Sequence, residues 1–323
     1  MVSDKTLESY KPSFWFKNGH LNTLFPYFFR KNLSLGFERI PIDTSDNDFI
    51  HIDIIKDQPK GLVILCHGLE GSSASQYIQG TAKYLLDNGW NIAAMNYRFC
   101  SGVINKQPRI YHSGATDDLY TVVQHFESAY QFIALVGFSL GGNLVLKYLG
   151  ENRFPIPKAV KVAVGISVPT DLEAGSLQIS KPSNYIYQNR FLKSLGKKIQ
   201  AKHQQYPELI DLSLLKQTKT LYDFDDLFTG PIHGFMNAHD YYSKCSSKQF
   251  IRYIDKPTLI INALDDPFLP AECYPIKESQ SNSSVELLTP RYGGHVGFVT
   301  KGSQAYWNEK MILHFIDKRY KTR

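Results

Sequence analysis

Hydrophobic and polar residues alternate along the chain in two rhythms from residue 61 onward. Short runs rich in apolar and β-branched residues occupy 61–67, 91–97, 131–138 and 159–167. Amphipathic stretches separate them, at 75–89, 116–129 and 140–150. Short apolar runs between turn residues are typical of buried strands, and a period near 3.6 predicts helices. We therefore predict a mostly parallel sheet whose strands are joined by helices, one closed by Gly89 and one capped by Thr116.

The rhythm breaks between about 170 and 250, where the chain is polar and rich in aromatic residues. It returns with apolar runs at 257–264 and 284–289 and a final helix near 302–317. An insertion in a doubly wound sheet usually rises over the carboxyl ends of the strands, where ligands bind. We predict a single α/β domain over 1–323, with a helical lid insertion at approximately 170–250.

The motif with the strongest chemical implication is GFSLG at 137–141, which matches G-x-S-x-G. It lies between a predicted strand and a predicted helix, which is the position of a nucleophile elbow. The sharp turn crowds the backbone around Ser139 and lifts its hydroxyl above the sheet, so only glycine fits at 137 and 141. The alternative is a glycine-rich turn with a capping serine. The coincidence of strand, turn and helix favours Ser139 as a nucleophile.

A serine nucleophile needs a base that takes its proton during attack. In α/β-hydrolases the acid and then the histidine follow the serine along the chain. His295 lies in the glycine-rich segment RYGGHVGF (291–298), after the predicted strand 284–289 and before the last helix. We predict His295 as the general base, the alternative being a loop histidine bonded to backbone. Other histidines fit worse, on strand or helix patterns or in the insertion: His51, His125, His203, His233, His239 and His314.

The segment NALDDPFLP (262–270) ends an apolar run in two adjacent aspartates. The acid that orients His295 has to lie just past a strand, and the pattern small-x-x-Asp-x-x-apolar-Pro places Asp266 there. Pro267 restricts Asp266 to extended conformations, which helps to hold it in place. Asp265 is the second choice, because a loop alignment from sequence can shift by one residue.

Two backbone N–H groups are expected to form the oxyanion hole, which binds the charge that develops on the carbonyl oxygen. One donor is normally the residue after the nucleophile, here Leu140 at the start of a helix. The other is expected in the loop after the first strong strand, where CHGLEG (66–71) points to Leu69. An ordinary turn at His67 and Gly68 is the alternative.

Several segments together resemble the YheT-like α/β-hydrolases: HGLEGSS (67–73), NYRFCSG (96–102), YHSGATDDL (111–119), GFSLGGN (137–143), LYDFDDLFTGPIHGF (221–235) and NALDDPFLP (262–270). The N-terminal GHLNTLFP (19–26) fits the same pattern, so the resemblance covers nearly the whole chain. These are bacterial proteins assigned as esterases, related to the eukaryotic ABHD1/ABHD3 and yeast ethyl-ester synthase/esterase branch. Phe99 departs from the family, which often has glycine there.

The resemblance implies the α/β-hydrolase fold, a mostly parallel central sheet flanked by helices with a helical lid, and ester hydrolysis or acyl transfer without a cofactor. We predict a serine carboxylic-ester hydrolase that acts through Ser139, His295 and Asp266 and an acyl-enzyme, on a small-molecule acyl ester of short or medium chain. Three alternatives remain open: an acyltransferase with an alcohol as acceptor, a lipid-ester hydrolase, and a non-catalytic binding member of the fold.

Composition narrows the remaining classes. With 323 residues, 43% hydrophobic and 20% charged, the chain can bury a sizeable core. The net charge of +6 owes much to the ends, for example Lys318, Arg319, Lys321 and Arg323. No zinc-finger, RNP-type or helix-turn-helix signature accompanies this charge, so nucleic-acid binding is not expected. The four cysteines show no CxxC spacing, which argues against disulfides and zinc and favours a reduced cytoplasm.

Other features argue against a metal and a membrane span. His51 and Asp53 form an H-x-D pair without further ligands, so no metal is expected. Residues 1–16 lack the basic and apolar regions of a secretory signal, and no segment approaches 18 apolar residues. The sequence therefore predicts a soluble protein that makes at most weak peripheral contact with a membrane, and it leaves the oligomeric state open.

Two parts of the sequence have two interpretations each, one structural and one as a lipid-binding surface. Residues 190–203 have apolar positions at helical spacing with basic residues between them, which favours a lid helix with a solvated face over a membrane-surface helix. The aromatic clusters FWF (14–16) and FPYFF (25–29) are expected to pack on the core, as such clusters near a domain start usually do.

Overall fold

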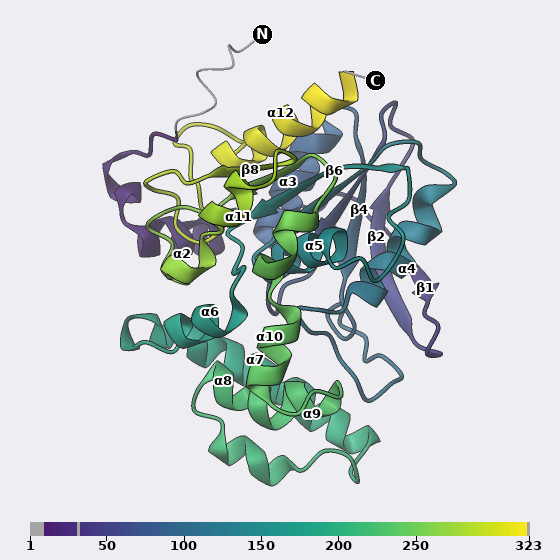
Figure 1. The fold of residues 1–323 in the computed structure, drawn as a ribbon, viewed down its shortest axis with the longest axis vertical. Helices are drawn as coiled ribbons and strands as arrows, with labels where there is room; N and C mark the ends of the chain where they lie inside the picture. The colour runs from purple at the N-terminus through teal and green to yellow at the C-terminus, as the bar shows by residue number, and fades with distance from the viewer. Residues whose placement is uncertain (1–9, 31–32, 322–323) are drawn as a thin grey trace.

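One eight-stranded sheet between two layers of helices forms the centre of the computed structural model, which describes residues 10–30 and 33–321 (Figure 1). The strand order is β1-β2-β4-β3-β5-β6-β7-β8. The strands are β1 (Glu38–Asp43), β2 (Phe49–Ile55), β3 (Leu62–Cys66), β4 (Asn91–Asn96), β5 (Ile133–Phe138), β6 (Val160–Ile166), β7 (Thr258–Ile261) and β8 (Val285–Leu288). β2 pairs antiparallel with β1 and β4, and all other neighbours are parallel. The predicted fold class is confirmed.

Helices cover both faces of the sheet because the central strands are apolar on both sides. In the described part of the chain, the α-helices outside the insertion are α2 (Gly19–Phe29), α3 (Gln76–Leu86), α4 (Thr116–Glu127), α5 (Leu140–Gly150), α11 (Ile276–Gln280) and α12 (Trp307–Lys321). Alternate residues of β3 enter two separate cores. Ile64 packs in the cluster that contains Leu119 of α4 and Leu144 of α5. Val63 packs in the cluster that contains Ile78 of α3 and Ile312 of α12.

Two predicted helix starts are wrong. Thr116 is the first residue of α4 and not its cap, which is Ala115; the Thr116 hydroxyl donates instead to the Glu151 carboxylate. The last helix begins at Trp307 and not near 302, because the chain first makes a turn with Gly302 at a φ of 73°. Residues 1–9 and 322–323 lie outside the described residues, so most of the segment scanned for a secretory signal, and Arg323, are not described.

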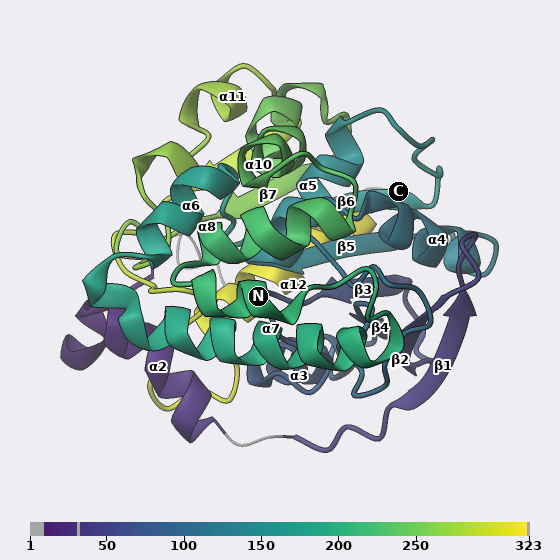
Figure 2. The same ribbon diagram turned by 90° about the horizontal axis from the view of Figure 1, so that it is seen from below.

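The insertion between β6 and β7 is helical and lies beyond one edge of the sheet (Figure 1). It contains α6 (Leu172–Ile179), α7 (Tyr185–Gln205), α8 (Leu221–Phe224), α9 (Gly230–Ile232) and α10 (Ala238–Cys245). Figure 2 shows the long α7 crossing this side of the molecule in front of the sheet. Leu195 and Ile199 of α7 pack against Phe224 and Phe228 in a small core of their own. The helices of the insertion are therefore stabilised by apolar packing against one another.

The sequence pattern predicts that the basic residues of α7 lie on a solvated face. This prediction holds for only some of them. Lys193 and Lys197 are exposed. Lys202 is fully buried and donates to the carbonyl oxygens of Asn105 and Gln107 at 2.6 and 2.5 Å. Burial lowers the pKa of Lys202 to about 8.

The expectation that the N-terminal aromatic clusters pack on the core is wrong. Phe14 and Trp15 are 76% and 71% exposed, and Phe28 and Phe29 of α2 are 65% and 70% exposed. The helix is held instead by its opposite side, where Asn22 is fully buried. Within residues 10–30 and 33–321, no helix is both long and apolar enough to cross a membrane.

Candidate active site

Ser139 occupies a strained turn between β5 and α5. Its φ of 52° and ψ of −120° are unusual for a residue with a side chain. A Cβ on Gly137 would come within 2.2 Å of the Gly141 carbonyl oxygen, and one on Gly141 within 2.3 Å of the Cys66 carbonyl oxygen. Both glycines are therefore required by close backbone packing, which is the physical basis of a nucleophile elbow.

A continuous chain of polar contacts joins the three residues that the sequence pointed to. Ser139 Oγ lies 2.9 Å from His295 Nε2. His295 Nδ1 lies 2.9 Å from Asp266 Oδ2 and 3.1 Å from Asp266 Oδ1. The Asp266 side chain is fully buried, and its Oδ1 also accepts from the N–H of Phe268 at 2.9 Å. This geometry lets His295 accept a proton from the serine while the carboxylate orients the ring.

Asp265 has a different set of contacts. Its Oδ1 accepts from the N–H of Gly294 at 2.9 Å, and its Oδ2 is buried without a partner among the described residues. Burial, only partly offset by that hydrogen bond, raises the pKa of Asp265 to about 6. The two aspartates therefore have different contacts. Asp266 contacts the His295 ring, and Asp265 binds the backbone of Gly294, the residue before His295.

The N-terminal helix α2 fixes the loop that carries His295. Thr23 Oγ1 accepts from the N–H of His295 at 2.8 Å and donates to the carbonyl oxygen of Gly19. Asn22 Oδ1 accepts from the N–H of Val299 at 3.0 Å. Sequence reasoning noted GHLNTLFP (19–26) only as part of the resemblance and missed this role. Nothing in its spacing shows that Thr23 meets a residue 272 positions away.

Leu69 and Leu140 present free backbone donors beside Ser139. Neither N–H has a hydrogen-bond partner in the described part of the chain, and both residues line the pocket that contains Ser139. The loop of Leu69 lies against the nucleophile, since a Cβ on Gly68 would be 3.1 Å from the Ser139 Cβ. Two unpaired donors that line one pocket can both donate to a carbonyl or anionic oxygen bound there.

His67 supports this loop and does not belong to the reacting chain. The ring is fully buried, and His67 Nδ1 lies 2.7 Å from the carbonyl oxygen of Gly68. Its Nε2 accepts from the N–H of Tyr97 at 3.3 Å. Burial lowers the pKa of His67 to about 3, so the imidazole is neutral at physiological pH.

A cavity of about 270 Å³ surrounds Ser139 and His295. Its walls come from three parts of the chain: α2, the loops at the ends of the central strands, and the insertion. Most of the wall is apolar, with Leu24, Ile179, Phe191 and Phe268 among the lining residues. The site is therefore a largely apolar chamber with a polar reacting group on one wall, as small-molecule sites usually are.

A family model described as alpha/beta hydrolase fold matches residues 61–302. This chain belongs to the α/β-hydrolase family. The hydrolase is 36% identical to YheT of Escherichia coli (strain K12), a protein provisionally designated an esterase, over 88% of this chain and 85% of YheT. It is 29% identical to human phospholipase ABHD3, over 90% of this chain and 74% of that protein. It is 27% identical to human monoacylglycerol lipase ABHD2, over 96% and 80% of the two chains. The resemblance to the YheT-like group is confirmed.

Solved structures share the fold of this hydrolase at low sequence identity. The Pyrococcus furiosus esterase Pf2001 superposes with a TM-score of 0.57 at 17% identity, covering 89% of this chain and 92% of that one. An esterase from Exiguobacterium antarcticum superposes with a TM-score of 0.53 at 15% identity, covering 87% and 100%. At such identities the comparison supports the fold alone.

Glu70 links the oxyanion loop of the hydrolase to the insertion. Its carboxylate is buried and accepts from Lys198 Nζ at 2.7 Å, from the Ser194 hydroxyl and from the Tyr111 hydroxyl. Lys198 and Ser194 both belong to α7. Glu70 follows Leu69 directly and has a φ of 54°, so the insertion helix holds a strained residue next to a free N–H donor.

The far wall of the chamber carries a carboxyl group that the reacting chain does not use. Asp225 Oδ2 accepts from the Tyr242 hydroxyl at 2.6 Å, and both residues line the cavity. Burial raises the pKa of Asp225 to about 6. The chamber therefore has a second polar region on the insertion side, where Ser176 and Thr229 also line the cavity.

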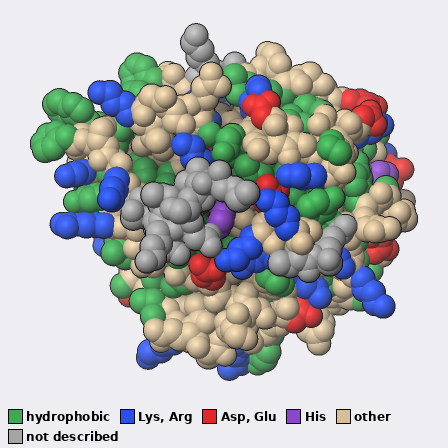
Figure 3. Space-filling model, turned by 90° about the horizontal axis from the view of Figure 1, so that it is seen from above, with side chains coloured by type: hydrophobic (Ala, Val, Ile, Leu, Met, Phe, Trp, Pro, Cys, Tyr) green, Lys and Arg blue, Asp and Glu red, His purple; other side chains and the backbone are tan. Residues whose placement is uncertain are grey.

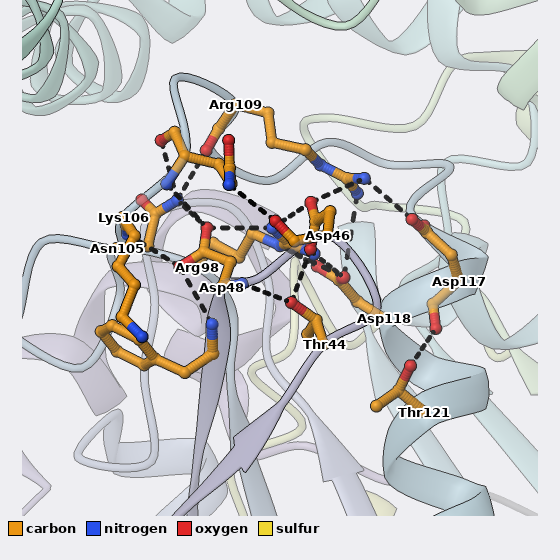
Figure 4. Close-up of polar contacts among 12 residues, drawn as sticks. Thr44, Asp46, Asp48, Arg98, Asn105, Lys106, Arg109, Asp117, Asp118 and Thr121 are labelled. Atoms are coloured by element: carbon orange, nitrogen blue, oxygen red, sulfur yellow. Dashed lines mark hydrogen bonds and ion pairs between the residues drawn. The ribbon is translucent and has the colours of Figure 1, made fainter.

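A buried ion cluster fixes the loop between β4 and α4, which supplies Ile110 and Tyr111 to the pocket wall (Figure 4). Arg98 donates to Asp48 at 2.9 Å, to Asp46 at 2.8 Å and to Asp118 at 2.7 Å. Burial alone would lower the pKa of Arg98, but its bonds to Asp118 and Asp46 outweigh this and raise it. The charge is thus paired on three sides, as a buried ion requires.

The H-x-D pair noted in the sequence has other partners. Asp53 accepts from Arg39 at 2.7 Å and from the Ser73 hydroxyl, and His51 Nδ1 lies 2.7 Å from the Ser101 hydroxyl. The described residues contain no cluster of three or more His, Cys, Asp or Glu side chains arranged to hold a metal ion.

Proposed function

We propose that the protein is a serine carboxylic-ester hydrolase and that Ser139, His295 and Asp266 carry out the reaction. The observation that supports this most strongly is the contact chain from Asp266 through His295 to Ser139, with the 2.9 Å contact of Ser139 Oγ and His295 Nε2 inside an apolar cavity. Relatives named as esterase, phospholipase and lipase favour ester bonds among the reactions that this machinery performs.

In the proposed mechanism His295 takes the Ser139 proton at Nε2 while Ser139 Oγ attacks the acyl carbonyl carbon. Asp266 accepts from His295 Nδ1–H and stabilises the imidazolium that forms. The N–H groups of Leu69 and Leu140 donate to the developing oxyanion. The imidazolium returns the proton to the leaving alcohol, and the acyl group stays on Ser139. Water, activated by the same histidine, then releases the acid.

We propose a small-molecule acyl ester as substrate, with its acyl chain against the apolar cavity wall. An ester of short or medium chain suits a partly open chamber of about 270 Å³. The insertion at approximately 170–250 is proposed to act as a lid, since α6, α7 and α8 contribute lining residues. We propose that neither a cofactor nor a metal takes part in the reaction. The cytoplasmic location stays a prediction.

A panel of p-nitrophenyl esters of graded acyl length tests this function. The wild type is expected to hydrolyse at least part of the panel, with Ser139→Ala lowering kcat on the order of 10⁶, as for serine-protease nucleophiles. Ser283→Ala, at an exposed turn serine outside the cavity, serves as the matched control and should keep wild-type rates. Turnover by folded Ser139→Ala at the wild-type rate would refute the assignment of Ser139 as the nucleophile. Transfer of the acyl group to added alcohol in place of water would favour the acyltransferase.

A further inference from the structure

The N-terminal segment, from the 3-10 helix η1 (Phe14–Lys17) through α2, exposes a group of large apolar side chains, here called the aromatic face. Seven of the sixteen exposed large hydrophobic residues in the described part of the chain fall within residues 14–29, so the exposure is concentrated and not scattered. They are Phe14, Trp15, Leu21, Phe25, Tyr27, Phe28 and Phe29, and Tyr185 and Ile186 of α7 extend the face. Exposed apolar patches of this kind usually mark interaction sites.

The aromatic face reaches the mouth of the active-site cavity. Tyr27, Phe28 and Ile186 belong both to the face and to the cavity lining. Figures 1 and 2 place α2 beside the N-terminal end of α7. His20 Nδ1 lies 3.2 Å from the Tyr187 hydroxyl, and the Arg190 guanidinium lies 4.2 Å from the Tyr27 ring centre. A partner bound to the face would therefore sit at the entrance used by the substrate.

The two segments that form the face carry side-chain charge of one sign only. Residues 10–30 contain no Asp or Glu, and neither does α7. Lys11, Lys17 and Arg190 are exposed there, and Figure 3 shows Lys and Arg side chains around hydrophobic ones at its left edge, the side on which Figure 1 draws α2. Aromatic side chains with Lys and Arg around them suit the headgroup region of a bilayer, and the positive charge suits anionic lipid.

We propose that the aromatic face docks the protein on an anionic lipid surface, with the mouth of the cavity turned towards the lipid. Docking depends on the surface alone, whereas the delivery of a lipid-borne ester to Ser139 also rests on the proposed function. Thr23 of α2 accepts from the N–H of His295, so the docked helix is bonded directly to the loop that carries His295. An ester could then pass from the lipid into the cavity without crossing water.

Docking is tested with full-length Ser139→Ala protein, so that it is measured without catalysis. The protein is sedimented with vesicles of phosphatidylcholine, with and without phosphatidylglycerol. Trp15 reports contact, because the other two tryptophans, Trp90 and Trp307, are buried. We expect binding that is stronger to the anionic vesicles and weakened by salt, together with a blue shift of the Trp15 emission that Trp15→Phe abolishes.

Two double variants make the test specific. Trp15→Ser with Phe29→Ser removes two apolar side chains that do not line the cavity, and should weaken vesicle binding about tenfold or more. Leu209→Ser with Met236→Ser removes two equally exposed apolar side chains of the insertion and should bind as the parent. In a Ser139-containing background, the first variant should lose turnover of vesicle-borne esters and keep turnover of soluble ones.

Three results would overturn the proposal. Absence of vesicle binding and of any Trp15 shift would mean that the face does not meet lipid. Equal binding by the two double variants would place the lipid contact elsewhere. Self-association of the parent that Trp15→Ser with Phe29→Ser abolishes, without vesicle binding, would assign the face to a second copy of this chain.

Discussion

Replacing each aspartate of the 265–266 pair by asparagine separates the acid from its neighbour. Asp266 Oδ1 is held by the N–H of Phe268, and Oδ2 faces His295 Nδ1. In Asp266→Asn the amide oxygen keeps the Phe268 bond, so the amide NH₂ points at Nδ1. The ring is then forced to carry its proton on Nε2, where it has to accept the proton of Ser139. The variant should fold normally and fail as a base.

The expected loss in kcat is on the order of 10⁴, by comparison with the acid of a serine-protease triad. At 1.36 kcal/mol per factor of ten, this corresponds to about 5.4 kcal/mol of transition-state stabilisation. In Asp265→Asn the amide oxygen still accepts from the N–H of Gly294, so kcat should fall by less than about threefold. The pKa of Asp265 is raised above its usual value, so its ionised form destabilises the fold as pH rises through about 6. Asp265→Asn should therefore be more stable than the wild type at pH 8.

The assay is steady-state hydrolysis of one soluble p-nitrophenyl ester by the wild type and both variants, with thermal unfolding measured on the same samples. The expected result is a loss of activity confined to Asp266→Asn, whose thermal stability is unchanged, together with a higher thermal stability of Asp265→Asn at pH 8. The assignment is refuted if Asp265→Asn loses as much activity as Asp266→Asn, or if Asp266→Asn keeps more than about a tenth of the wild-type kcat.

Four further predictions concern residues around the site. Glu70→Gln keeps the shape of the side chain and removes the charge that pairs with Lys198. It should lower kcat about tenfold or more with KM nearly unchanged. A loss of kcat/KM of about tenfold that comes from KM alone would contradict a role of Glu70 in positioning the Leu69 N–H. Arg98→Met leaves buried carboxylates unpaired and should cost about 3 to 5 kcal/mol in urea unfolding, and a loss below about 1 kcal/mol would contradict the cluster's role. Asp225 has a pKa of about 6 in the fold, above the ordinary 3.8, so the wild type should lose at most about 3 kcal/mol of unfolding free energy between pH 4 and pH 7 through this group. Asp225→Asn should remove this pH dependence. Equal dependence of the two proteins' unfolding free energy on pH, measured in urea, would contradict this. Phe99 has a φ of 62°, a conformation that costs a residue with a side chain about 1 kcal/mol. Phe99→Gly should therefore unfold at a temperature similar to or higher than that of the wild type, and a clearly lower unfolding temperature would contradict this.

The central strands and the elbow could be predicted from sequence because their signals are local. Residues 61–67 and 131–138 are apolar runs bounded by turns, and the structure places β3 and β5 within them. Ser139 could be singled out because its two glycines answer a steric need of the turn itself. Asp266 could be ranked above Asp265 because Pro267 and the spacing to Pro270 describe a single loop. These are properties of a few neighbouring residues.

The parts that could not be predicted depend on contacts between distant residues. Thr23 contacts His295, and Glu70 contacts Lys198. No sequence pattern indicates either contact, because the partners are far apart along the chain. The same limit explains the error over the aromatic clusters. Their composition indicates burial, but the tertiary structure buries the other side of α2, and only the fold shows which side faces outward.

The central claim, that Ser139 is the nucleophile of this hydrolase, is tested most directly by covalent labelling with a fluorophosphonate. Intact mass spectrometry should show one adduct per chain on the wild type, with peptide mapping placing it on Ser139. His295→Ala should react far more slowly, since the serine then lacks its base. Ser139→Ala should show no adduct. Folded wild-type protein that remains unlabelled, or an adduct on any other serine, would contradict the account.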